Sequence, residues 1–254
     1  MTWDPKTYLS FEAERTRPAV ELLAGVPSDG PANVADLGCG TGNSTALLAT
    51  RWPNARIEGI DSSPDMLAEA SKSIVRAQWL KADIADWTPR YTLDVIFSNA
   101  ALQWIPDHDR LLPRLMSFVR EGGALALQVP RNFNEPCHAL IRAVAQGGRW
   151  AHKLAAVADW ENVRSPEDYF AILEPHAVRI EIWETRYVQM LEGEDAVYRW
   201  MSGTGLRPFA AALEGAEREA FLAEYKARLG QAYPRHASGK TLYPLRRLFA
   251  VAIR

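Results

Sequence analysis

The sequence has 254 residues, 48% of them hydrophobic and 24% charged, and 29 basic against 31 acidic side chains leave a formal net charge of -2. This composition is typical of a globular protein with a substantial core, and the charge balance argues against a nucleic-acid partner bound mainly through phosphates. No apolar run is long enough to span a bilayer, and segment 1–15 is too polar for a signal peptide. The two cysteines provide no disulfide framework, so we expect a cytoplasmic protein without a membrane partner.

The first half of the chain alternates short apolar runs with helical patterns. The apolar runs predict strands at 33–37, 56–60, 77–81, 93–98 and 124–129. Helices are predicted at 43–52, from Pro64 after a Ser62 or Ser63 cap, and at 110–120, where Glu121-Gly122-Gly123 end the helix. Strand–helix alternation at this spacing favours an α/β fold whose parallel strands are joined by right-handed crossovers.

The second half of the chain loses this rhythm. Two further strands are predicted, at about 178–190 and about 246–254, and a long connection precedes each of them. Connections of this length rarely lack structure of their own, so we expect them to form helices over the carboxyl edge of the sheet. The segments expected in this helical cap are about 1–25, 131–173 and 191–243. Sheet and cap together are predicted to make one domain, 1–254.

Three alternate glycines leave the first predicted strand and enter a helix, in the segment VADLGCGTGNS. Gly38, Gly40 and Gly42 let the backbone approach a ligand closely, with amide N–H groups that point at it. Asp36, just before the turn, suits a ligand with an ammonium group better than a pyrophosphate, which it would repel. A dinucleotide-binding fingerprint needs a glycine where Asn43 stands, which weighs against a nicotinamide-dependent dehydrogenase.

Two more acids follow predicted strands. Asp61 ends the second strand, where a carboxylate accepts hydrogen bonds from ribose hydroxyls. Asp83 follows the third strand, where it would accept a bond from an adenine amine while Ile84 packs on the ring. Either acid has a plainer interpretation: Asp61 would stabilise the start of a helix, and Asp83 would be an ordinary turn residue.

Four motifs in this region resemble those of class I S-adenosylmethionine-dependent methyltransferases. They are DLGCGTG, GIDSSPDM, KADIADW and LDVIFSNAALQW, within about 30–130. The resemblance implies a Rossmann-like, seven-stranded, mostly parallel sheet with an antiparallel last strand, and S-adenosylmethionine as the donor, with S-adenosylhomocysteine as its product. It also implies that Asp36 and the glycines hold the methionine moiety, Asp61 the ribose and Asp83 the adenine amine, while Asn99 lines the methyl-donor pocket.

Motifs outside this core narrow the resemblance to one bacterial family. W-D-P-x-x-Y at 3–8, the run from Phe11 to Leu23, T-G-L-R-P at 204–208 and R-L-F-x-V-A at 247–252 are similar to those of trans-aconitate 2-methyltransferases. That family implies esterification of one carboxylate of a small polycarboxylic acid, with no obligate protein partner. Two alternatives stay open: a carboxyl methyltransferase for another acid, such as malonyl on a carrier protein, and a module that binds the donor without turnover.

A carboxylate acceptor sets its own requirements on the site. It is already ionised near pH 7, so we expect no catalytic general base. A cation on the reacting carboxylate would stabilise the ground state, so neutral donors should lie there and arginines on the other carboxylates. The candidate acceptor-binding residues are Tyr8, Gln103, Trp104, Arg207 and Arg247. The plainer interpretations are that Gln103 lies at the surface, Trp104 packs in the core and the two arginines are solvated. The five histidines are scattered, so the sequence predicts no metal site.

Overall fold

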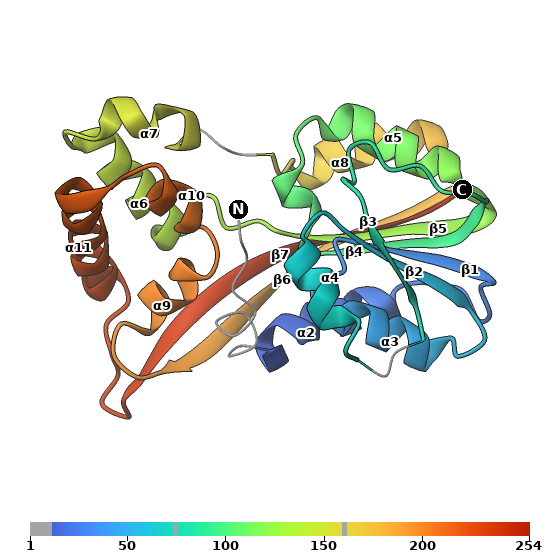
Figure 1. The fold of residues 1–254 in the computed structure, drawn as a ribbon, viewed down its shortest axis with the longest axis horizontal. Coiled ribbons are helices and arrows are strands. Elements are labelled where there is room, and N and C mark those ends of the chain that lie inside the picture. The colour runs from blue at the N-terminus through green and yellow to red at the C-terminus, as the bar shows by residue number, and fades with distance from the viewer. Residues whose placement is uncertain (1–11, 74–75, 159–161) are drawn as a thin grey trace. The chain divides into compact units, whose positions relative to one another are not determined.

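Seven strands form one sheet in the computed structural model, which describes residues 12–73, 76–158 and 162–254. The strands are β1 (Asn33–Leu37), β2 (Arg56–Asp61), β3 (Gln78–Lys81), β4 (Leu93–Asn99), β5 (Val119–Pro130), β6 (Arg179–Glu192) and β7 (Lys240–Ile253). Their order is β3-β2-β1-β4-β5-β7-β6 (Figure 1). The pairs from β3 to β5 are parallel, whereas β7 runs antiparallel to β5. The predicted seven-stranded, mostly parallel sheet with an antiparallel last strand is confirmed.

The chain divides into two compact units. The first holds the residues up to Pro130, Asn162–Thr185 and Arg247–Arg254, and the second holds Arg131–Glu161 and Arg186–Arg246. Helices of the first unit are α2 (Glu12–Ala24), α3 (Asn43–Arg51), α4 (Pro64–Ala70), α5 (His108–Phe118) and α8 (Pro166–Leu173), with the 3-10 turns η1 (Leu102–Trp104) and η2 (Glu174–His176). Helices α2 and α3 cover one face of the sheet, and α5 and α8 cover the other (Figure 1).

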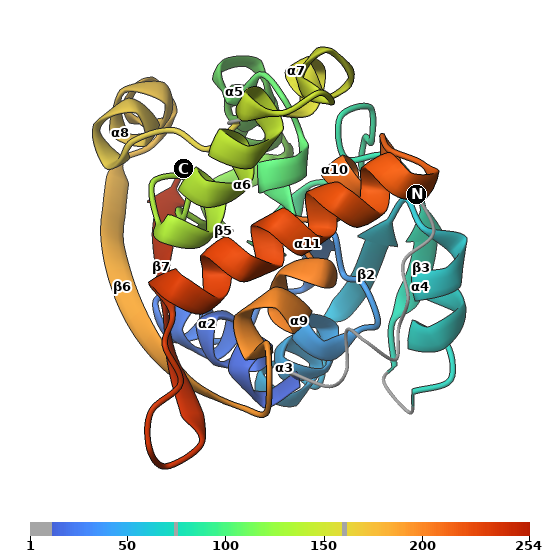
Figure 2. The same ribbon diagram turned by 90° about the vertical axis from the view of Figure 1, so that its left-hand side faces the viewer.

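The second unit is helical apart from the outer parts of β6 and β7. Its helices are α6 (Pro136–Gly147), α7 (Ala151–Ala158), α9 (Ala196–Ser202), α10 (Arg207–Ala211) and α11 (Gly215–Ala232). The long helix α11 lies beside α6 and α9 (Figure 2). Two segments that we predicted in the cap, those of α2 and α8, belong instead to the unit with the sheet, because α2 packs on α3 and β5 and α8 packs on α5.

The apolar pattern of the sheet explains its packing. In α5, Leu111, Leu112 and Leu115 are buried in one core cluster with Leu125 and Leu127 of β5. Alternate residues of β5 point to opposite faces, so these two leucines share the face that α5 covers. The other face of the same strands is therefore the one that α2 and α3 cover, which matters for the site below.

Two predicted boundaries near β5 and β7 are wrong. Glu121-Gly122-Gly123 do not end a helix; α5 stops at Phe118, and these residues form an irregular stretch of β5, where Gly122 has φ 71. Strand β7 begins at Lys240 rather than about 246. Its outer part alternates buried and exposed residues as a strand does, but Pro244 makes the sequence there look like a loop.

The start of α4 settles which serine caps it. Ser63 Oγ accepts a hydrogen bond from Met66 N at 3.4 Å, and Pro64 follows in the first turn. Ser63 is thus the cap among the two predicted serines, and it fixes the helix directly after β2.

No helix among the described residues is both long and apolar enough to cross a membrane.

Gly38 ends β1 in a place where no side chain fits. Its φ of 73 is left-handed, and a Cβ there would lie 2.1 Å from Ala101 Cβ. The turn after β1 and the segment after β4 therefore approach each other closely only because residue 38 is glycine.

We expect Gly38→Ala to lower the free energy of unfolding by roughly 2–5 kcal/mol, since left-handed backbone and overpacking each destabilise an alanine there. Denaturant unfolding measures this. Gly30→Ala is the matched control, because its added Cβ would meet no atom within 4 Å. Equal stability of the two variants would show that the close approach at Ala101 is not tight.

Candidate functional site

The turn between β1 and α3 has room for a ligand at one glycine. Gly40 and Gly42 have φ values of 54 and 88, and Gly42 is the N-cap of α3 without a side-chain cap. A Cβ on Gly42 would lie 2.9 Å from Trp79, but a Cβ on Gly40 would meet no atom within 4 Å. Gly42 thus serves packing, whereas the backbone of Gly40 borders open space that a ligand can occupy.

Asp36 is a buried carboxylate, and only one of its oxygens has a hydrogen-bond partner among the described residues. Its Oδ2 accepts hydrogen bonds from Ser44 Oγ at 2.7 Å and Thr45 Oγ1 at 2.6 Å, both at the start of α3. Within the described residues Oδ1 has no partner. Burial raises the pKa of Asp36 to about 6, against the two hydroxyl bonds, which lower it. A cation at Oδ1, such as an ammonium group, would favour the ionised form and lower this pKa.

Asp61 holds the glycine turn against the end of β2. Its Oδ2 accepts a hydrogen bond from Gly40 N at 2.9 Å, and its Oδ1 accepts one from Ser63 N at 2.8 Å. The half-buried carboxylate therefore has the structural role at the start of α4 that its plainer interpretation gave it, and it also holds Gly40, which the sequence did not indicate. Each oxygen keeps a further acceptor position, so a ligand hydroxyl can bind the same side chain.

Asp83 and Ile84 lie in the turn after β3. Asp83 is exposed, its Oδ1 accepts a hydrogen bond from Ala85 N at 2.9 Å, and its carbonyl accepts one from Trp87 N at 2.8 Å. Ile84 is buried, with its Cδ1 3.7 Å from the position that a Gly38 Cβ would take. Asp83 therefore stabilises its turn, as its plainer interpretation predicted, and its contact with adenine stays a prediction.

Asn99 lies beside the glycine turn, on the sheet face that α2 covers. Asp36 is opposite Phe97 in the β1–β4 pair, so Asp36 and Asn99, one pleat further along, share that face. Asn99 Oδ1 is buried without a partner in the described part of the chain. A cavity of about 30 Å³ opens here. Its lining residues are Thr16, Ala19, Gly38, Cys39, Thr41, Asn43, Ser44 and Asn99.

A strained turn places Gln103 and Trp104 just after β4. Ala100 has a left-handed φ of 55, and Gln103 Nε2 donates to its carbonyl at 2.7 Å. Gln103 is buried, and its Oε1 has no partner among the described residues. Trp104 is half-buried in the same turn, η1. This burial therefore argues against the alternative that Gln103 is a surface glutamine.

The two predicted arginines belong to different units. Arg247 lies within β7 opposite Pro130 and is only 9% exposed, whereas its neighbour Arg246 is exposed. Arg207 is half-buried and starts α10 in the second unit. Tyr8 lies outside the described residues.

Gln128 was missed by the sequence analysis. It is fully buried in β5, opposite Asn99 in β4 and Phe249 in β7. Neither its Oε1 nor its Nε2 has a partner in the described residues. The only available signal was one polar residue in the apolar run 124–129, which is common enough in strands to be overlooked.

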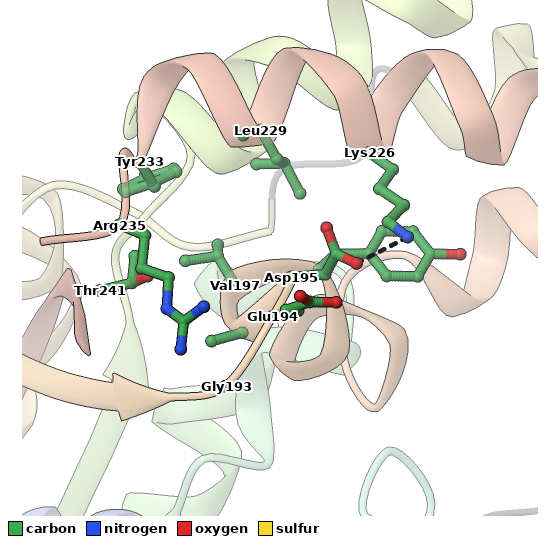
Figure 3. Close-up of a pocket in the computed structure, with 12 residues that line it drawn as sticks. Gly193, Glu194, Asp195, Val197, Lys226, Leu229, Tyr233, Arg235 and Thr241 are labelled. Atoms are coloured by element: carbon green, nitrogen blue, oxygen red, sulfur yellow. Dashed lines mark ion pairs between the residues drawn. The ribbon is translucent and has the colours of Figure 1, made fainter. Parts of the chain in front are cut away.

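A second cavity, of about 340 Å³, lies inside the other unit (Figure 3). Three of its four charged lining groups have partners: Lys226 forms an ion pair with Asp195 at 2.6 Å, and Arg235 Nε donates to the Gly239 carbonyl at 2.9 Å. None of the predicted site residues lines it. No three His, Cys, Asp or Glu side chains of the described residues lie close enough together to hold a metal ion.

Comparisons with known proteins bear on the same segments. The family model for a methyltransferase domain matches residues 34–123. The chain is 47% identical to the trans-aconitate 2-methyltransferase of Azoarcus sp. strain BH72 over 253 residues, covering 100% of this chain and 99% of the relative. It is 45% identical to the enzyme of that name from Escherichia coli O157:H7 over 252 residues, covering 99% and 98%.

Solved structures show the same fold at low identity. The YcgJ protein of Bacillus subtilis has a TM-score of 0.62 and 12% identity, with 94% of this chain and 98% of that chain covered. Phosphoethanolamine N-methyltransferase 2 of Haemonchus contortus, solved with S-adenosyl-L-methionine, has a TM-score of 0.54 and 15% identity, with 93% and 52% covered.

The pKa of Asp36 makes stability depend on pH in an unusual direction. Its pKa rises from 3.8 in an ordinary setting to about 6 in the folded chain, so the folded state holds the proton more tightly. Between these values a rising pH ionises Asp36 first in the unfolded chain, and stability falls. Relative to Asp36→Asn, the wild type should lose about 2.4 kcal/mol of unfolding free energy from pH 4 to pH 7.

Denaturant unfolding of both proteins across this pH range measures the difference. The other titrating groups are the same in both proteins, so their contributions to the pH dependence cancel in the comparison. Parallel stability curves for the two proteins would mean that the Asp36 carboxyl titrates normally.

Proposed function

The chain belongs to the trans-aconitate 2-methyltransferase family, and we propose that it uses S-adenosylmethionine to methylate one carboxylate of trans-aconitate, which yields a monomethyl ester and S-adenosylhomocysteine. The observation that carries this proposal is the 45–47% identity to enzymes of that name over 99–100% of the chain. This similarity includes the second unit and both ends of the chain as well as the glycine core.

The first unit offers a donor set that fits S-adenosylmethionine. The free oxygen of buried Asp36 suits the ammonium group, and the uncapped start of α3 suits the carboxylate of the amino-acid end. The remaining roles are proposed as in the family: Asp61 for the ribose hydroxyls, Asp83 and Ile84 for the adenine, and Asn99 beside the methyl donor. When bound, the donor supplies a sulfonium methyl group, which goes to the acceptor oxygen while the electrons of the broken C–S bond stay on sulfur.

The acceptor half of the site is proposed to align a carboxylate and keep it dry. The carboxylate is the nucleophile and is ionised at pH 7, so no residue needs to remove a proton. Opposite charges are neutralised as the methyl group moves, which a water-poor pocket favours. Gln103 and Trp104 are the proposed neutral donors. Arg247, buried in β7, is proposed to bind a carboxylate that is not methylated. The acceptor contacts predicted for Arg207 and Tyr8 rest on the sequence alone.

We also propose that the enzyme works in the cytoplasm on a free small molecule, without nucleic acid or an obligate protein partner. Its cysteines, Cys39 and Cys137, are both free and buried, which suits a reducing compartment.

A labelled-methyl assay across di- and tricarboxylic acids and a malonyl group on a carrier protein tests this function. We expect trans-aconitate to give the highest kcat/KM, with ester and S-adenosylhomocysteine formed in equal amounts. Arg247→Leu should reduce kcat/KM for trans-aconitate at least tenfold, because a buried cation no longer meets the second carboxylate.

Two results would contradict the proposal. Turnover only with the carrier-bound malonyl group would assign another acceptor. Donor binding by calorimetry without turnover of any acid would indicate a binding module rather than an enzyme.

A further inference from the structure

We propose that Gln128 binds the acceptor, with its side-chain amide donating to the carboxylate that receives the methyl group. This inference rests on the proposed function and deepens it, because it adds a specificity-determining residue on the central part of the sheet. The reasons lie in the burial of this side chain, its place among the site residues, and its lack of charge.

Gln128 is a buried polar side chain whose amide forms no hydrogen bond to any described residue. It is 0% exposed, and neither Oε1 nor Nε2 finds a partner within the described residues. Buried amides are almost always hydrogen-bonded, so an idle one in the middle of a sheet calls for a ligand or a water. Leu or Val would pack in the same strand without this cost.

Strand register places Gln128 between the two halves of the proposed site. It pairs with Asn99 of β4 on one side and with Phe249 of β7 on the other, so all three share one sheet face. Asp36 is on this face as well, one pleat before Asn99 in register. Arg247 follows on the same face, two residues before Phe249.

The spacing along this face suits an acid with more than one carboxylate. Neighbouring strands lie about 4.8 Å apart, which puts Gln128 directly beside Asn99. Arg247 is the diagonal neighbour of Gln128, at about 7–8 Å between their Cα atoms. One carboxylate can therefore meet the amide of Gln128 near the donor while another meets the buried guanidinium.

Charge decides which of the two groups holds the reacting carboxylate. The acceptor oxygen loses its negative charge as the methyl group transfers, so a cation bound to it would favour the ground state. A neutral amide orients the oxygen with a smaller penalty of this kind. Gln128 meets this requirement and Arg247 does not, so we assign the reacting carboxylate to Gln128.

The experiment compares Gln128→Leu with a matched control, Leu127→Met. Leu127 is also fully buried in β5 but points to the opposite face, into the core cluster. In Gln128→Leu we expect the KM for trans-aconitate to rise at least tenfold, the donor Kd to stay within twofold, and the thermal midpoint to stay equal or rise. In Leu127→Met the KM should not change.

Gln128→Glu gives a second readout that a purely structural residue would not produce. Its carboxylate would repel the acceptor, so the KM should rise further at pH 7.5 and fall again toward pH 6, as the buried carboxyl takes up a proton and becomes a donor. The wild-type KM, measured at saturating donor, provides the reference at each pH.

The outcomes separate the two proposals. An unchanged KM in Gln128→Leu, with an active wild type, overturns the inference alone and indicates that the amide bonds to Asn99 or to a buried water. Equal increases in the KM and the donor Kd also overturn it, because they indicate a general distortion of β5. A wild type that does not methylate trans-aconitate overturns the proposed function, and this inference with it.

Discussion

A carboxylate buried beneath the glycine turn is the constraint on which the rest of the site depends. Asp36 is bonded through one oxygen to Ser44 and Thr45, and its other oxygen has no partner in the described chain. Burial of this group raises its pKa to about 6, so a positive group beside the second oxygen would stabilise its ionised form. The fold therefore places a buried acid at the end of β1, and we propose the ammonium end of the methyl donor as its partner.

The neighbouring contacts keep that anion and the turn in place. Asp61 accepts backbone bonds from Gly40 and Ser63, which joins the turn after β1 to the start of α4. Gly38 allows the same turn to approach Ala101 after β4. The proposed donor half of the site is thus built from three adjacent strand ends, as open α/β sheets build their ligand sites. On the proposed acceptor side, Gln128 and Arg247 extend the same face to β5 and β7.

Sequence patterns predicted the parallel strands well because apolar runs, glycine turns and helix caps are local signals. The predicted boundaries were wrong where strand pairing determines the structure. Glu121-Gly122-Gly123 belong to β5, and β7 extends outward past Pro244, a residue that is not typical of a strand. The same contrast holds for the site. Asp36 and Asp61 follow from position in a motif, whereas Gln128 and the burial of Arg247 depend on which strand neighbours β5. No local pattern in 124–129 contains that information.

The most direct test is the pH dependence of donor binding, measured by isothermal titration with S-adenosylmethionine on the wild type and on Asp36→Asn. A carboxyl with a pKa of about 6 is ionised in about one molecule in ten at pH 5, so the wild-type Kd should be about tenfold weaker there than at pH 7.5. The asparagine variant should bind weakly at both values. A wild-type Kd that is the same at pH 5 and pH 7.5, or one that the substitution leaves unchanged, would contradict the account.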